Sequence, residues 1–130
     1  MTRVLIAAGL LIALAGAAIA SADPRNVVVL GTKSATGRKA HALVVAPNIP
    51  TDTFRRLTME VTAKPRQRVQ AGWIGICFGG IMGRPAYETR GRTPLSIEIE
   101  LSDVEHRCNV TADATLAGKG RVTIQVVGRR

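Results

Sequence analysis

Few side chains in this sequence could do acid–base or nucleophilic chemistry, and none is spaced as in a known catalytic motif. The two histidines, His41 and His106, lie in neither an H-E-x-x-H pattern nor beside a G-x-S-x-G pattern. Glu98 and Glu100 resemble an acid pair, but they alternate with apolar residues beside Ser96, which indicates the solvent face of a strand. We therefore expect no catalytic residue, no cofactor and no bound metal.

The cysteines, Cys77 and Cys108, are the next candidates for chemistry. A metal site would have to recruit His41 and His106 without the usual ligand spacing, and a cysteine nucleophile would lack a recognisable base motif. In an exported protein an even number of cysteines favours a bridge. We expect a Cys77–Cys108 disulfide, which would stabilise the fold by about 3–4 kcal/mol.

A group of arginines could bind anions. The longest segment without a clear strand pattern spans 79–94, and it carries Arg84, Tyr87, Arg90 and Arg92. Guanidinium groups hold phosphate, carboxylate or sulfate through forked hydrogen bonds, and long loops often carry binding sites. The segment predicts an anion-binding loop; a merely solvated basic loop is the alternative.

A second basic group surrounds Pro65. Its members are Arg55, Arg56, Lys64, Arg66 and Arg68. Charge of this kind also occurs along exposed strand edges, where it prevents aggregation, so the group has a purely structural interpretation.

The overall composition is strongly basic. The chain has 18 Lys and Arg against 9 Asp and Glu, a net charge of +9. Such a balance favours anionic cell-wall polymers or a membrane surface as partners, although solubility alone could select it. We do not expect nucleic acid as a partner, because the chain has the features of an exported protein and lacks an aromatic stacking platform.

The N-terminus has the pattern of a secretory leader. Arg3 precedes an apolar run over 4–20, and Ala20-Ser21-Ala22 supplies the small residues of a cleavage site. We expect a signal-peptide helix at 1–22, a single disulfide-stapled β-domain at 23–130, and a secreted, extracellular protein that can associate with the cell envelope. An uncleaved transmembrane anchor is the alternative.

Beyond the leader, apolar and polar residues alternate with a period of two, which indicates strands. The expected strands are 26–30, 40–46, 54–62, 68–78, 95–102, 108–116 and a terminal strand around 124. Small residues over 31–37 and the segment Pro47–Pro50 are expected to interrupt pairing. This pattern predicts an all-β, two-sheet antiparallel sandwich of about seven strands, or eight if 86–90 pairs as an edge, with a small β-barrel as the alternative.

One expected strand, 68–78, carries apolar residues on both faces. Trp73 and Cys77 share one face, whereas Ile74, Ile76 and Phe78 share the other. An exposed apolar patch would mark a protein partner or a homo-oligomer interface. The alternative is that another layer of the fold covers it.

Several segments in the second half of the chain follow a recognisable pattern. They are Val61-Thr62-Ala63-Lys64-Pro65-Arg66-Gln67-Arg68-Val69-Gln70-Ala71-Gly72-Trp73-Ile74-Gly75-Ile76-Cys77, Gly79-Gly80, Thr93-Pro94, Cys108-Asn109-Val110-Thr111-Ala112 and Leu116-Ala117-Gly118-Lys119-Gly120. This arrangement, W-x-x-x-C, a polar loop, then C-x-V-x-A and a closing hairpin, resembles small secreted β-domain proteins of actinobacteria. The resemblance implies export, one disulfide and a β-fold, and it assigns no binding or catalytic residue.

Overall fold

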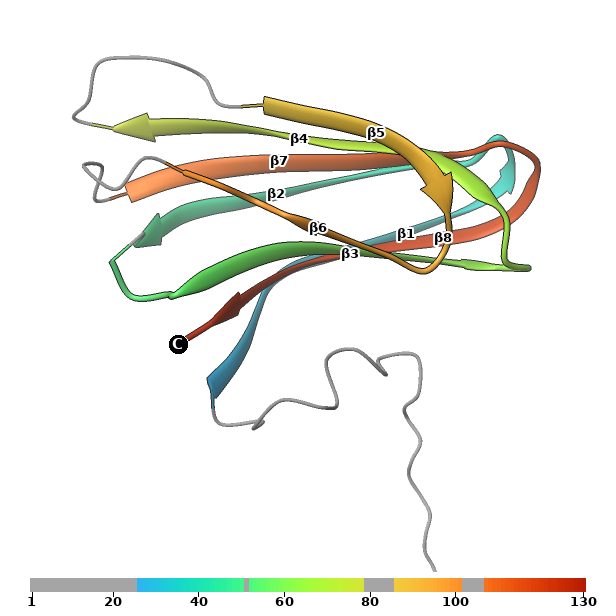
Figure 1. Ribbon diagram of the computed structural model, residues 1–130. Coiled ribbons are helices and arrows are strands. Elements are labelled where there is room, and N and C mark those ends of the chain that lie inside the picture. Colours follow the sequence, from blue (N-terminus) through green and yellow to red (C-terminus); the bar gives the residue numbers. More distant parts are fainter. Residues whose placement is uncertain (1–25, 51, 79–85, 102–106) are drawn as a thin grey trace, which may run out of the picture.

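The computed structural model describes residues 26–50, 52–78, 86–101 and 107–130, without the side chain of Phe78 (Figure 1). The expected leader at 1–22 lies outside these residues, as does Arg84. In the described segments, no helix is long and apolar enough to cross a membrane. The strands are β1 (Val27–Arg38), β2 (His41–Pro50), β3 (Arg56–Lys64), β4 (Arg68–Phe78), β5 (Ala86–Arg92), β6 (Leu95–Glu98), β7 (Arg107–Leu116) and β8 (Lys119–Arg129).

The eight strands form two antiparallel sheets of four strands each, in the orders β1-β8-β3-β6 and β2-β7-β4-β5. The expected two-sheet sandwich is confirmed, and the sheets do not close into the alternative barrel. At one side of the sandwich, β1 and β2, which belong to different sheets, are joined by a tight turn. The closing hairpin expected around Gly118 is absent, because β7 and β8 also lie in different sheets. At the other side, β5 and β6 belong to different sheets and run apart from the turn that joins them (Figure 1).

The core lies between the sheets and is built from alternate residues of each strand. In β7 and β8, the buried residues are Val110, Ala112, Ala114, Leu116, Val122, Ile124 and Val126. Alternation places every second side chain of a strand on the same face. Because β7 and β8 lie in different sheets, each strand presents a continuous apolar stripe to the opposite sheet. Fully burying a Val, Leu or Ile side chain contributes about 1.5–3 kcal/mol, so these stripes supply much of the driving force for folding.

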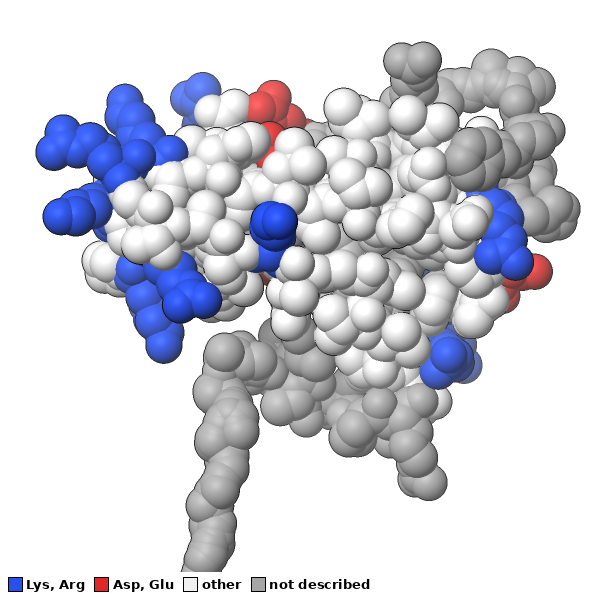
Figure 2. Space-filling model, turned by 180° about the vertical axis from the view of Figure 1, so that it is seen from behind, with Lys and Arg blue, Asp and Glu red and all other residues white. Residues whose placement is uncertain are grey.

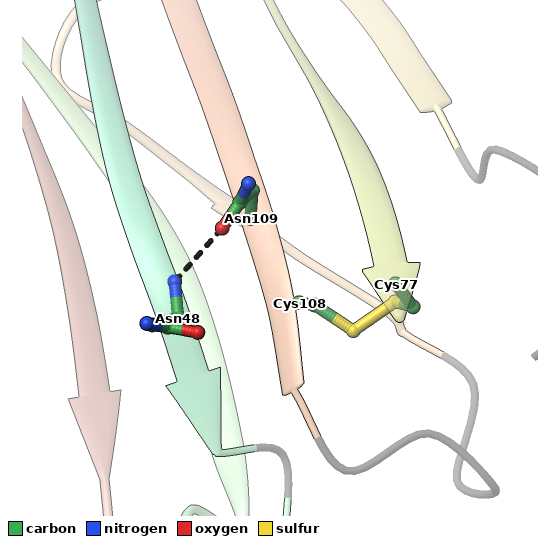
Figure 3. The surroundings of a disulfide bond; sticks show 4 residues. All are labelled: Asn48, Cys77, Cys108 and Asn109. Carbon is green, nitrogen blue, oxygen red and sulfur yellow. Dashed lines mark hydrogen bonds between the residues drawn. A yellow bond between two sulfur atoms is a disulfide. The ribbon is translucent and has the colours of Figure 1, made fainter. Parts of the chain in front are cut away.

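The disulfide joins neighbouring strands of one sheet. Cys77 in β4 and Cys108 in β7 are directly opposite in the ladder and are bonded, as expected (Figure 3). Beside them, the side-chain oxygen of Asn109 accepts a hydrogen bond of 2.8 Å from the backbone N–H of Asn48 (Figure 3). The bridge and this hydrogen bond together tie the ends of β2, β7 and β4.

Two expected strand breaks are absent. The small residues expected to form a turn over 31–37 belong to β1, and Pro47–Pro50 belongs to β2. In β2 a register irregularity between Ala46 and Ile49 accommodates Pro47 and Asn48. In β1 the irregularity lies earlier, between Val29 and Gly31, and residues 31–37 pair with β8 in regular register. Both strands are sheet edges, where a missing ladder hydrogen bond is tolerated.

The strand expected over 95–102 is shorter than its alternation suggests. β6 ends at Glu98, and the backbone of Ile99 makes one further hydrogen bond, of 2.9 Å, to the carbonyl of Leu57. Ile97 and Ile99 are nevertheless buried. The apolar alternation therefore reports burial against the core beyond the point where ladder pairing stops.

Candidate functional site: a basic end of the sandwich

Lysine and arginine side chains gather at one end of the molecule (Figure 2). We call this region the basic end and define it by the cations in and beside the four turns that join β1 to β2, β3 to β4, β5 to β6, and β7 to β8. They are Arg38, Lys39, Lys64, Arg66, Arg68, Arg90, Arg92, Lys119 and Arg121. The segments 36–41, 62–70, 89–96 and 115–122, which contain these turns, have no Asp or Glu. The basic end is therefore a surface of nearly pure positive charge.

Gln67 joins two of these turns. Its side-chain Nε2 donates to the carbonyls of Pro65 (3.1 Å) and Lys119 (3.0 Å). Its Oε1 accepts a 2.8 Å hydrogen bond from the backbone N–H of Gly118. One amide side chain thus fixes the β3–β4 turn against the β7–β8 turn, and so fixes the backbone that carries Lys64, Arg66 and Lys119.

Thr93 joins a third turn to the same framework, and its side chain is buried. Its backbone N–H donates to the carbonyl of Gln67 at 3.0 Å, and its hydroxyl accepts from the backbone N–H of Gln67 at 3.2 Å. The fourth turn is tied in by Lys39, whose N–H donates to the carbonyl of Gly118 at 2.7 Å. The backbone under the basic end is consequently ordered before any ligand binds, which lowers the entropic cost of binding.

The close approach of the turns requires a glycine at one position. A Cβ atom on Gly120 would lie 2.5 Å from the carbonyl oxygen of Lys64, and Gly120 has a φ of 152°. Both the short distance and the positive φ favour glycine. Gly120 therefore lets the β7–β8 turn lie against the turn at Pro65.

A surface cavity of about 410 Å³ opens at the basic end. Lys39, Arg68 and Arg90 line it, together with the polar side chains of Gln70 and Thr115. These five residues come from the β1–β2 turn and from strands β4, β5 and β7, so the cavity depends on the tertiary fold. Three cations and two neutral polar groups around one depression suit a phosphate, sulfate or carboxylate group.

The arginines beside this cavity face like charges. Arg68 and Arg92 are direct cross-strand partners on β4 and β5. Salt bridges in the described part of the chain join other residues, His41 to Asp113 (2.9 Å) and Arg56 to Glu98 (3.5 Å). Like charges directly opposite each other destabilise a sheet, so a bound anion would relieve a repulsion that the fold leaves in place.

The expected anion-binding loop is mostly a strand. Tyr87, Arg90 and Arg92 belong to β5, which pairs with β4 from Ile74↔Ala86 to Arg68↔Arg92. The loop assignment is wrong here because β5 is an edge strand: pairing on one side with β4 holds it, although its own residues are mostly polar. The possibility of an eighth strand near 86–90 is confirmed.

The strand also divides the residues of that expected site between its two faces. Arg90 and Arg92 share the outer face with their partners Gln70 and Arg68, whereas Tyr87 is the partner of Trp73, which is buried between the sheets. Tyr87 therefore does not accompany the two arginines.

The second basic group is likewise divided. Lys64, Arg66 and Arg68 belong to the basic end, whereas Arg55 and Arg56 precede or begin β3 at the opposite end of the sandwich. Arg38, Lys39, Lys119 and Arg121 were not predicted from the sequence to belong to a site. One signal could have found them: in a sandwich of consecutive antiparallel strands, every second turn lies at the same end, and four such turns each carry cations.

The apolar residues on the outer face of β4 are exposed. The exposed fraction is 49% for Ile74 and 45% for Ile76, and on β2 it is 46% for Leu43 and 51% for Val45. We call these four residues the apolar face; they lie on the outer side of the sheet β2-β7-β4-β5. The side chain of Phe78, expected to belong to the same surface, lies outside the described structure.

Comparison with known proteins gives no relative: no family model, no curated protein and no solved structure matches the chain. Within residues 26–50, 52–78, 86–101 and 107–130, no group of three or more His, Cys, Asp or Glu side chains could hold a metal ion.

Proposed function

We propose that this protein is a secreted, non-catalytic module that binds anionic polymers of the cell envelope through the basic end. The observation that carries the proposal is the convergence of cations from four separate turns, each joining the two sheets, on one end of the sandwich, without an acidic residue in those turns. A surface of one sign raises the local concentration of oppositely charged ligands and steers them into contact.

An extended ligand fits this surface better than a single small anion does. The cavity holds three of the cations, Lys39, Arg68 and Arg90, and the others surround it on the neighbouring turns. A polymer with repeated phosphate or carboxylate groups could place one group in the cavity while others contact the remaining cations. Arginine is the commoner cation at this end, and its planar fork suits such groups.

Sedimentation with purified cell walls across a salt series tests this proposal. The informative variant replaces Arg68, Arg90 and Arg92 with Ser, and the matched control replaces Arg55, Arg107 and Arg130, which lie at the opposite end and carry the same charge. We expect the bound fraction of the native protein and of the control to fall as salt rises, because salt screens charge interactions. The basic-end variant should sediment little even at low salt.

Two outcomes would overturn the proposal. Equal loss of binding in the two variants would show that net charge, rather than the basic end, attracts the polymer. No sedimentation of the native protein at low salt would exclude the polymer as a ligand. Anionic liposomes in a parallel series distinguish a membrane surface from the wall.

A second candidate function is association through the apolar face, and the exposure of its four residues favours it. Leu43, Val45, Ile74 and Ile76 are each about half exposed, and such a patch can form an interface with a second copy or a protein partner. Light scattering on the native protein and on an Ile74→Ser, Ile76→Ser variant tests self-association. A concentration-dependent mass in the native protein that the variant lacks would support this function, and a monomer at all concentrations would exclude the homo-oligomer.

A further inference from the structure

The open side of the sandwich holds a cavity unrelated to the basic end. It has a volume of about 580 Å³ and is lined by residues of β5 and β6, which belong to different sheets, and by Trp73 of β4. This volume is in the range of roughly 300–1,000 Å³ that is typical of small-molecule sites. In the described part of the fold, β5 pairs with β4 and β6 pairs with β3, so each strand turns its other edge toward this opening.

The indole of Trp73 has an unsatisfied hydrogen-bonding group. Its side chain is 5% exposed, and Nε1 is the one buried side-chain nitrogen or oxygen among the described residues for which no partner is present. Buried donors in folded proteins are nearly always paired, because an unpaired donor loses its hydration without compensation. Less than 1 Å² of this nitrogen is accessible, so an acceptor oxygen on a ligand in the cavity would supply the missing partner only after the side chains over the indole shift.

The rest of the lining combines apolar side chains with polar groups that are not positively charged. Leu95 and Ile97 contribute apolar surface, and Tyr87, the direct cross-strand partner of Trp73, is 52% exposed. Glu98 and Glu100 also line the cavity, and among the residues that the structure describes no Lys or Arg does. This composition disfavours an anionic ligand and favours one with an apolar face and several hydroxyl groups.

We propose that this cavity binds a neutral saccharide ring. The C–H face of a sugar ring packs on an exposed aromatic ring such as that of Tyr87. A shift of the side chains over the indole then lets a hydroxyl or ring oxygen accept from Trp73 Nε1. Other sugar hydroxyls donate to the carboxylates of Glu98 and Glu100 or to strand-edge carbonyls. The inference does not depend on the proposed function, because none of the nine residues of the basic end lines this cavity.

Trp73 makes the test direct, because it is the only tryptophan in the chain. The native, disulfide-bonded protein is titrated with maltotriose, cellotriose and triacetylchitotriose while its tryptophan emission is recorded. We expect at least one of these sugars to shift the emission with a saturable dependence on concentration. The triple variant of Arg68, Arg90 and Arg92 should respond like the native protein, which separates this cavity from the basic end.

Two variants identify the contacts, and calorimetry measures their affinity. Tyr87→Ala removes an exposed ring, so it should fold normally and lose the binding. Trp73→Phe keeps an aromatic ring but removes the donor, and should weaken binding by about fivefold to tenfold, the effect of one hydrogen bond. Absence of a saturable response to all three sugars, or full affinity in the Tyr87→Ala variant, would overturn the proposal.

Discussion

Arg68 and Arg92 lie directly opposite each other across β4 and β5, on the outer face of the sheet. The fold thus places two guanidinium groups where an opposite-charge pair would stabilise the ladder. The like-charge pair lowers the free energy of unfolding but suits the binding of an anion. Such a trade-off is expected where selection acts on a binding surface.

The pair gives the first prediction. Replacing Arg92 by Glu would turn the cross-strand repulsion into an attraction and should raise the free energy of unfolding by about 0.2–1 kcal/mol. The same change should weaken binding to cell walls. Urea unfolding measures the stability and sedimentation measures the binding. Arg92→Gln removes the repulsion without adding an attraction, so its free energy of unfolding and its cell-wall binding should both be intermediate. Lower stability of Arg92→Glu than of the native protein would contradict the prediction.

Gln67 provides a test of whether the framework under the basic end matters. Gln67→Ala removes hydrogen bonds to Pro65, Lys119 and Gly118, so the free energy of unfolding should fall by about 1–2 kcal/mol. Cell-wall binding should also weaken, although no charge is lost, because the two turns would no longer hold their cations in place.

The control for Gln67 is Gln125→Ala, a change in β8 outside the four turns of the basic end. It should leave binding unaltered. If Gln67→Ala binds cell walls as tightly as the native protein does, the hydrogen bonds stabilise the fold without organising the site.

The close contact at Gly120 leads to a third prediction. Gly120→Ala would place a Cβ atom against the carbonyl of Lys64 at a φ of 152°, and should destabilise the protein by about 1–3 kcal/mol. Thermal unfolding checks this expectation. Gly118→Ala is a suitable comparison because its Cβ would meet only the flexible side chain of Gln67, at 3.3 Å. Equal melting temperatures for the two variants would show that the β7–β8 turn can shift away from Pro65.

The disulfide gives a fourth prediction. A Cys77→Ser, Cys108→Ser variant loses a cross-link between residues 31 positions apart, and its free energy of unfolding should fall by about 3–4 kcal/mol. Urea unfolding with and without a reductant measures the effect. Reductant should destabilise the native protein to about the level of the variant and leave the variant unchanged; native stability that is insensitive to complete reduction would contradict the role assigned to the bridge.

Local periodicity was sufficient to predict most of the sandwich. Strands such as β7 alternate between buried and partly exposed residues because each neighbour along an extended chain points to the opposite face. β5 could not be predicted with the same assurance, because its polar residues hold a strand conformation only through pairing with β4. The extent of β2 was also missed, since a register irregularity on this edge strand accommodates Pro47 and Asn48. That of β1 was missed because residues 31–37 extend the strand through regular pairing with β8, which their small polar side chains do not indicate.

The sequence by itself determined the alternation that builds the core, the excess of positive charge and the pairing of the two cysteines. Tertiary structure decided which cations act together: Lys39, Arg68 and Arg90 are far apart along the chain and line one cavity because alternate turns, each crossing from one sheet to the other, meet at the same end of the sandwich. It also separated Tyr87 from Arg90 by facing them to opposite sides of β5, and placed Tyr87 beside Trp73. Strand register sets these relationships, and register depends on pairing between distant segments that no local pattern encodes.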